Sequence, residues 1–123
     1  MRFEDFYNNL KSLFPDIREL QVWTEWDWSN DSCEQCVVIS EVAREMIKWA
    51  SKNEFEKVDR LLIEIEKAIS EADDSVKSYI GTDFLVTILE VKNKEIRKKI
   101  KSLMKEQTSA AYQIILRGYG EPN

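Results

Sequence analysis

Apolar residues recur three and four positions apart along most of the chain, a spacing typical of amphipathic α-helices. Pro15 and Asn53 interrupt this pattern, and a proline in particular ends a helix at the preceding residue. The pattern predicts about six helices, over residues 2–14, about 32–52, 54–72, about 75–89, 94–105 and 107–117. Between Pro15 and the second helix we expect an irregular or weakly helical connector.

The joints between these helices are short, so neighbouring helices must run antiparallel. We therefore predict an all-α fold of about six short helices stacked as antiparallel hairpins, with HEAT-like packing. No fixed repeat is present, because the second to fifth helices differ in length and share no motif. The 123 residues suit one all-helical domain covering residues 1–123.

The apolar stripes also predict which side chains face the core. The stripes consist of Phe3, Phe6, Leu10, Leu13 and Phe14 in the first helix, Cys36, Ile39, Ala43, Met46, Ile47 and Ala50 in the second, Val76, Ile80, Phe84, Ile88 and Leu89 in the fourth, and Ala111, Ile114 and Ile115 in the sixth. Gly81 falls inside the fourth helix, where glycine costs up to about 1 kcal/mol relative to alanine. A close crossing with another helix would explain its presence.

Charge is distributed unevenly along the chain, whose net charge is −5. Residues 1–36 contain eight acidic and three basic residues, whereas residues 92–123 contain three acidic and eight basic residues. Between Asp16 and Glu34, six acidic residues stand against Arg18 alone. An acidic front of this kind repels nucleic acid and attracts basic proteins, mainly by raising the association rate.

The densest group of candidate binding residues is the segment QVWTEWDWSND, residues 21–31, which holds three of the four tryptophans. The predicted partner surface consists of Trp23, Glu25, Trp26, Asp27, Trp28, Asp31, Glu34, Asp73 and Asp74. Tryptophan supplies a large contact area at binding hot spots, while the acids attract a basic partner over longer distances. The alternative is that the tryptophans pack in the core and the acids are their hydrated flanks.

Several catalytic arrangements are excluded by composition. The chain has no histidine, which removes the commonest general base and metal ligand, and its three glycines form no phosphate-binding loop. Cys33 and Cys36, spaced as CEQC, are interpreted as reduced structural residues, with a redox pair or half of a metal site as alternatives. We therefore expect no catalytic residue, metal or cofactor. No segment resembles a membrane span or a signal peptide, which predicts a cytoplasmic protein without membrane contact.

Residues 92–105, KNKEIRKKIKSLMK, are strongly basic, whereas the rest of the chain is acidic. Ile96, Ile100, Leu103 and Met104 keep helical spacing within this segment. We interpret its lysines as the solvated face of an amphipathic helix, and a polyanion contact is the second interpretation.

Two segments resemble the pattern of small all-helical bacterial immunity proteins of polymorphic toxin and contact-dependent growth inhibition systems. In NEFEKVDRLLIEIEKAISEADDSVKSYIGTDFLVTIL, a helix that opens with an Asn-acid-Phe turn leads through an acidic loop into a second helix. In MKEQTSAAYQIILRGYGEPN, a small polar turn precedes a Tyr-bearing helix and a terminal aromatic-Gly pair. The resemblance implies a cytoplasmic inhibitor that binds a secreted toxin domain, often a nuclease, and has no activity of its own.

Pattern and resemblance together favour an immunity protein that forms a one-to-one complex with a basic toxin domain through its acidic, Trp-rich face. A helical adaptor that binds an unrelated host protein is the first alternative. An enzyme would have to use carboxylates such as Glu25, Asp27 and Asp31 as acid–base groups or Mg²⁺ ligands. Direct nucleic-acid binding through residues 92–105 is a further alternative, which the net acidic charge disfavours.

Overall fold

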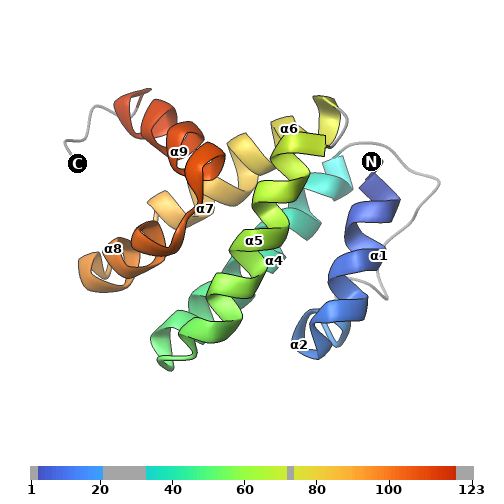
Figure 1. The fold of residues 1–123 in the computed structure, drawn as a ribbon, viewed down its shortest axis with the longest axis horizontal. Helices are drawn as coiled ribbons and strands as arrows, with labels where there is room; N and C mark the ends of the chain where they lie inside the picture. The colour runs from blue at the N-terminus through green and yellow to red at the C-terminus, as the bar shows by residue number, and fades with distance from the viewer. Residues whose placement is uncertain (1–2, 21–32, 72–73, 119–123) are drawn as a thin grey trace.

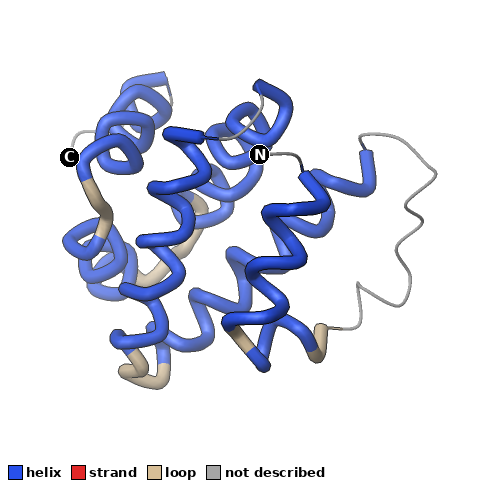
Figure 2. Tube along the Cα trace, turned by 45° about the vertical axis from the view of Figure 1, so that its right-hand side comes forward, coloured by secondary structure: helices blue, strands red, loops and turns tan. Residues whose placement is uncertain are grey.

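The computed structural model describes residues 3–20, 33–71 and 74–118, and every element in this part of the chain is helical (Figures 1 and 2). The elements are α1 (Phe3–Leu13), α2 (Pro15–Arg18), α4 (Cys33–Ser51), α5 (Phe55–Glu71), α6 (Asp74–Tyr79), the π-helical segment η1 (Ile80–Phe84), α7 (Leu85–Leu89), α8 (Lys94–Leu103) and α9 (Glu106–Gly118). The predicted all-α fold is confirmed. The short helix α2, which begins at Pro15, lies at the start of the predicted connector.

The centre of the fold is the hairpin of α4 and α5, the two longest helices. Helix α4 also contacts α2, η1, α7 and α8, while α5 contacts α1, α8 and α9. The hairpin turns at Asn53, whose φ of 62° lies in the left-handed region that ends helices and that asparagine tolerates better than most residues. Asn53 therefore ends the second predicted helix as expected.

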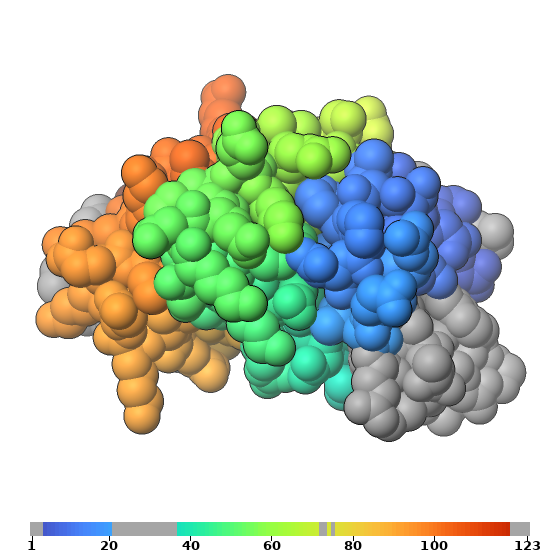
Figure 3. Space-filling model, turned by 90° about the horizontal axis from the view of Figure 1, so that it is seen from below, coloured from blue at the N-terminus to red at the C-terminus, as the bar shows by residue number. Residues whose placement is uncertain are grey.

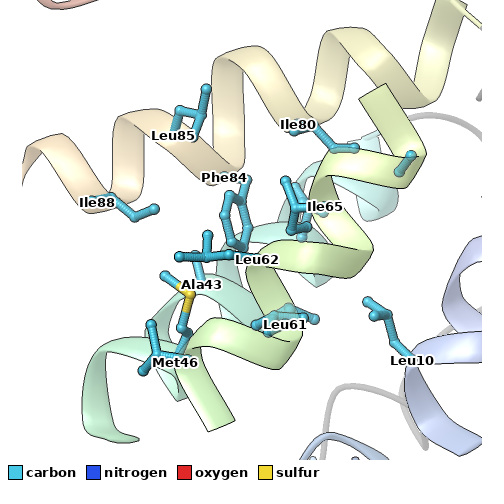
Figure 4. Close-up of a cluster of buried hydrophobic side chains, with 14 of the residues drawn as sticks. Leu10, Ala43, Met46, Leu61, Leu62, Ile65, Ile80, Phe84, Leu85 and Ile88 are labelled. Carbon is cyan, nitrogen blue, oxygen red and sulfur yellow. The ribbon is translucent and has the colours of Figure 1, made fainter. Parts of the chain in front are cut away.

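Elements α6, η1 and α7 follow one another without a break and form one helix with a π-helical middle. The backbone N–H of Leu85 donates to the carbonyl of Ile80, five residues earlier, as a π turn requires. The apolar residues Val76, Ile80, Phe84 and Ile88 stand four apart, so on a regular α-helix each step would drift by about 40°. The wider π turn offsets that drift, and all four side chains are buried. In Figure 4, Phe84 points toward the α4–α5 hairpin beside Leu62.

The explanation predicted for Gly81 is wrong. Gly81 lies inside η1, and a Cβ atom placed on it would meet no other atom within 4 Å. No helix crosses closely enough to require a glycine there. The position lies instead in the segment where the helix changes from α to π geometry.

The inner faces follow the predicted stripes with two corrections. In α1, Tyr7 is fully buried and moves the centre of the buried face away from Leu13, whose side chain is 38% exposed. In α9, the buried residues are Thr108, Tyr112 and Leu116, whereas Ile114 is 68% exposed. The error in α9 arose because a polar threonine belongs to the buried stripe, and a hydrophobic pattern cannot reveal it.

The packing of the last two helices also differs from a simple hairpin. Helices α8 and α9 follow each other closely in sequence, yet each contacts α5 more extensively than it contacts the other. Figure 1 shows α9 and α8 diverging from their joint at one end of the fold, opposite α1 and α2. Within the described part of the chain, no helix combines the length and apolar character needed to cross a membrane.

Candidate functional site

Most of the predicted partner surface lies outside the described residues. This applies to Trp23, Glu25, Trp26, Asp27, Trp28, Asp31 and Asp73. Of the remaining two residues, Asp74 is exposed at the start of α6, and Glu34 belongs to the first turn of α4 with its side chain outside the description. The side chains of Cys33 and Cys36 are likewise outside it. The surface and the reduced state of the cysteines therefore stay predictions.

The fourth tryptophan, Trp49, is a core residue that ties α4 to α2. Its side chain is only 2% exposed and packs against Phe14, with the ring centroids 5.7 Å apart. Its Nε1 donates a hydrogen bond of 3.0 Å to Oδ2 of Asp16. Nζ of Lys57, on α5, donates to the same oxygen at 2.9 Å. One carboxylate of α2 therefore joins two helices of the central hairpin.

The charge of Asp16 is compensated within the fold. The hydrogen bond from Lys57 holds the pKa of the Asp16 carboxyl below its ordinary value, against the opposing effect of burial, and the bond from Trp49 adds to the lowering. The same hydrogen bond raises the pKa of Lys57. Asp16 had been counted with the acidic front, but its charge is paired with Lys57 and contributes less to the attraction of a basic partner than an unpaired acid would.

A second carboxylate, Glu66 of α5, caps the N-terminus of α9. Its Oε2 accepts a hydrogen bond from the backbone N–H of Gln107 at 2.9 Å. Its Oε1 accepts bonds of 2.8 Å from both the backbone N–H and the hydroxyl of Thr108. Burial alone would raise the pKa of Glu66, but these hydrogen bonds outweigh it and lower the pKa. The contact explains why Thr108 is buried, because its polar groups are satisfied by Glu66.

Helix α8 carries a dense run of basic residues, seven within residues 92–105. Its inner side consists of the buried Ile100 and the half-buried Ile96, Leu103 and Met104, which confirms the predicted amphipathic pattern. Lys94 and Lys98, four residues apart, are exposed on the opposite side, whereas Lys101 is half-buried and takes part in an interaction. Figure 3 shows α8 at the end of the molecule opposite α1.

On α4 and α5, Arg44, Lys48 and Lys67 each pair with a glutamate three positions earlier, as in Lys48 with Glu45 at 3.9 Å and Lys67 with Glu64 at 3.4 Å. Lys94 and Lys98 are exposed and form no ion pair with any described residue. The charges of Lys94 and Lys98 therefore face solvent.

Other basic groups near α8 are engaged in contacts with the fold. Arg97 donates through Nη1 to the carbonyl of Val91 at 2.9 Å, and Lys105 binds the carboxylate of Asp59 on α5. The ammonium group of Lys99 lies 5.1 Å from the centroid of the Phe55 ring. Lys99 and Lys105 help to attach α8 and the α8–α9 joint to α5, whereas Arg97 ties α8 to the loop that precedes it. Among the described residues, no group of three or more carboxylates and thiols is arranged to hold a metal ion.

Sequence reasoning missed the two structural carboxylate contacts and the burial of Trp49. Trp49 stands three residues after Met46 on the inner face of α4, so helical spacing could have identified it as a core residue. The partners of Asp16 and Glu66 could not have been found in this way. They lie 33 to 42 residues away in sequence, and only the packing of the helices brings them together.

Comparison with known proteins places the chain in a family. No curated protein and no solved structure matches it. A family model described as a domain of unknown function, DUF7674, matches residues 7–119, which include every described helix from α2 to α9 and most of α1. The chain therefore belongs to the DUF7674 family.

Proposed function

We propose that this chain is an immunity protein that binds a cognate toxin domain, one to one, and blocks its basic surface. The observation that carries the proposal is the separation of charge. Residues 1–36 have a net charge of −5, and residues 92–123 have a net charge of +5. In the fold, α1 and α2 lie at one end and α8 lies at the other (Figure 1).

This separation gives the proposal a physical mechanism. A nuclease toxin must carry basic charge to hold phosphate groups, so an acidic protein can occupy its substrate site by resembling the polyanion. A molecule with opposite charges at its two ends also turns in the field of a basic partner and presents its acidic end. The basic α8 is then directed away from the toxin. Trp23, Trp26 and Trp28 would supply the desolvated centre of the contact, with the acids around it.

The described contacts support this assignment of roles. The segment that carries the three tryptophans connects α2 with α4, and the hydrogen bond from Trp49 to Asp16 joins these same two helices. The α2 end of the segment is therefore tied to the C-terminal part of α4, and its other end leads into the first turn of α4. Anchoring of this kind reduces the conformational entropy that the segment loses on binding. The two carboxylates with lowered pKa, Asp16 and Glu66, make structural contacts rather than forming an acid–base pair.

The proposal is tested by co-expression with the toxin domain encoded immediately upstream in the native strain. The chain alone should be harmless in the cytoplasm, and together with the toxin it should restore growth through a nanomolar or tighter complex, about −12 kcal/mol. Trp26→Ala or Trp28→Ala should weaken the complex by about 2 kcal/mol if either is a binding anchor. If no toxin-like domain is encoded there and no toxicity is relieved, the immunity function is wrong and the adaptor alternative replaces it.

A charge-reversal pair of variants tests which surface binds. Glu25→Lys, Asp27→Lys and Asp31→Lys together should slow association with the toxin by about tenfold or more at low salt, with little change in melting temperature. The matched control reverses three exposed acids elsewhere, Glu56, Glu90 and Glu106, and changes the net charge equally. Equal slowing by both variants would remove the Trp-rich segment from the proposed interface.

A further inference from the structure

The outer side of α9 carries an apolar residue where contact with water favours a polar one. The predicted core residue Ile114 is instead 68% exposed, the largest exposed fraction among the large apolar residues that the structure describes. Ala110, one turn earlier on the same side, is also exposed. Both lie opposite the buried side of the helix, which consists of Thr108, Tyr112 and Leu116. A single exposed isoleucine is ordinary on a protein surface, so its role depends on the charges beside it.

The charged residues on this side of α9 stand at its two ends. Glu106 begins the helix and Arg117 follows eleven residues later, so they are about 16 Å apart along the axis. Both are exposed, and neither forms an ion pair with a described residue. Steps of four, four and three residues place four exposed side chains on one line, which we call the α9 stripe: Glu106, Ala110, Ile114 and Arg117.

The α9 stripe is complementary to a second copy of itself. When two α9 helices pack antiparallel, Glu106 of each copy faces Arg117 of the other, so the contact gains two ion pairs. Parallel packing would instead place like charges together at both ends. In the antiparallel arrangement, Ile114 enters the space beside Ala110 of the facing helix, because the alanine side chain is small. The ends of the two helix dipoles that lie together are then of opposite sign.

The place of α9 in the fold leaves the stripe open to a second copy. The inner side of α9 packs on α5, η1 and α7, and Figure 1 shows the helix at the edge of the fold, away from α1 and α2. Because α9 has one acidic and one basic residue, two facing helices do not repel through net charge. One helix of this length provides less than the roughly 800 Å² per partner of a standard interface, which predicts a weak dimer with a Kd between about 10 μM and about 1 mM.

We propose that the α9 stripe is the interface of a weak antiparallel dimer of this chain. The two copies meet through the end of the fold opposite α1 and α2, so the acidic ends of both copies stay accessible. The proposal does not depend on the immunity function, and it leaves each copy able to bind one toxin domain. It can be tested without any toxin.

Sedimentation velocity of the full chain from about 10 μM to about 1 mM measures the dimer, which should dissociate on dilution. Ile114→Asp should weaken association by about a hundredfold, because a twofold-symmetric contact loses two isoleucines at once. The matched control is Ile63→Asp, which introduces the same charge at another exposed isoleucine, on α5. The control should leave the affinity within about threefold.

Charge exchange tests the antiparallel register. Glu106→Arg alone, or Arg117→Glu alone, places like charges together at both ends of the contact and should weaken self-association by about tenfold or more. An equimolar mixture of the two variants should restore association, because one copy is then positive at both ends of the stripe and the other negative at both. Circular dichroism of each variant establishes that it is folded.

Three results would overturn the proposal. The first is a chain that stays monomeric up to about 1 mM. The second is a dimer that Ile114→Asp and Ile63→Asp weaken equally, and the third is a mixture of the charge variants that associates no better than either variant alone. A monomeric chain whose Ile114→Asp variant no longer protects against the toxin would assign the α9 stripe to the toxin contact instead.

Discussion

The α4–α5 hairpin and α8 are both amphipathic, but they balance burial and charge in different ways. The hairpin buries long apolar stripes on its inner side, and three of its outer basic residues, Arg44, Lys48 and Lys67, are paired with nearby glutamates. Helix α8 has one fully buried residue, Ile100, and its exposed Lys94 and Lys98 face solvent without such partners. The outer charges of the hairpin therefore support its own helices, whereas those of Lys94 and Lys98 do not.

The largest expected difference between the hairpin and α8 comes from truncating one buried residue in each of them. Leu62 is fully buried between α4 and the α6–α7 helix, so Leu62→Ala should lower the free energy of unfolding by about 3–4 kcal/mol. Ile100→Ala should cost about 2 kcal/mol, because α8 lies at the edge of the fold and its neighbours can relax into the space. Urea denaturation measures both values. An equal or larger cost at Ile100 would contradict the view of α8 as a peripheral helix.

The docking of α9 should depend on pH through Glu66. The pKa of this carboxyl is lower in the folded protein than its ordinary value of 4.5, so folding favours the charged form. The stability it contributes is present above about pH 4.5 and is lost as the pH falls through the folded pKa. Glu66→Gln should cost about 2 kcal/mol at pH 7, because hydrogen bonds to a charged group are weakened or lost.

The pH dependence provides the check on Glu66. Denaturation curves from pH 7 to pH 3 should fall less steeply for Glu66→Gln than for the unmodified protein, since the variant has no carboxylate to protonate. Glu56→Gln, an exposed position on the same helix, serves as the control and should change stability by less than about 0.5 kcal/mol. Parallel curves for Glu66→Gln and the unmodified protein would show that Glu66 does not hold α9 through its charge.

Two substitutions of Asp16 separate the contribution of its hydrogen bond with Trp49 from that of its ion pair with Lys57. Asp16→Ala leaves the buried Nε1 of Trp49 without its acceptor and should cost about 1–2 kcal/mol. Asp16→Asn retains an acceptor oxygen and loses only the partly exposed ion pair with Lys57, so it should cost less than about 1 kcal/mol. Thermal denaturation of the two variants compares them. Equal costs would mean that the charge, rather than the hydrogen bond to Trp49, fixes α2.

The sequence predicted the helices well because each one buries an apolar stripe at helical spacing. The predicted helices end within two residues of α1, α4, α5, α7, α8 and α9. The same reasoning failed where polar residues enter the core, as Thr108 does in α9, and where a tertiary contact decides the role of a charge, as for Asp16. It also could not explain Gly81, because the π geometry of η1 depends on how the whole helix packs.

The candidate site was predicted less completely for a related reason. Sequence reasoning identified the basic segment that contains α8 and preferred to interpret its lysines as an ordinary solvated face. That preference rested on helical spacing, which the outer faces of α4, α5 and α8 share. The distinction lies in the paired glutamates: Lys48 and Lys67 pair with Glu45 and Glu64, whereas Lys94 and Lys98 form no ion pair with a described residue. For most of the Trp-rich surface, the described residues add the helices at the two ends of the segment and nothing of its interior.

The smallest expected effect is that of removing basic charge, which should stabilise the protein when done on α8 and destabilise it when done on the α4–α5 hairpin. Replacing Lys94 and Lys98 by glutamine removes like-charge repulsion from α8 and should raise the free energy of unfolding by about 0.3 kcal/mol. A control variant, with glutamine at Lys48 and Lys67, removes favourable pairs and should lower it by a similar amount. In thermal melts, the melting temperatures of both variants should approach that of the unmodified protein as the salt concentration rises, because salt screens the charges. If the α8 variant is less stable than the control, Lys94 and Lys98 stabilise the fold.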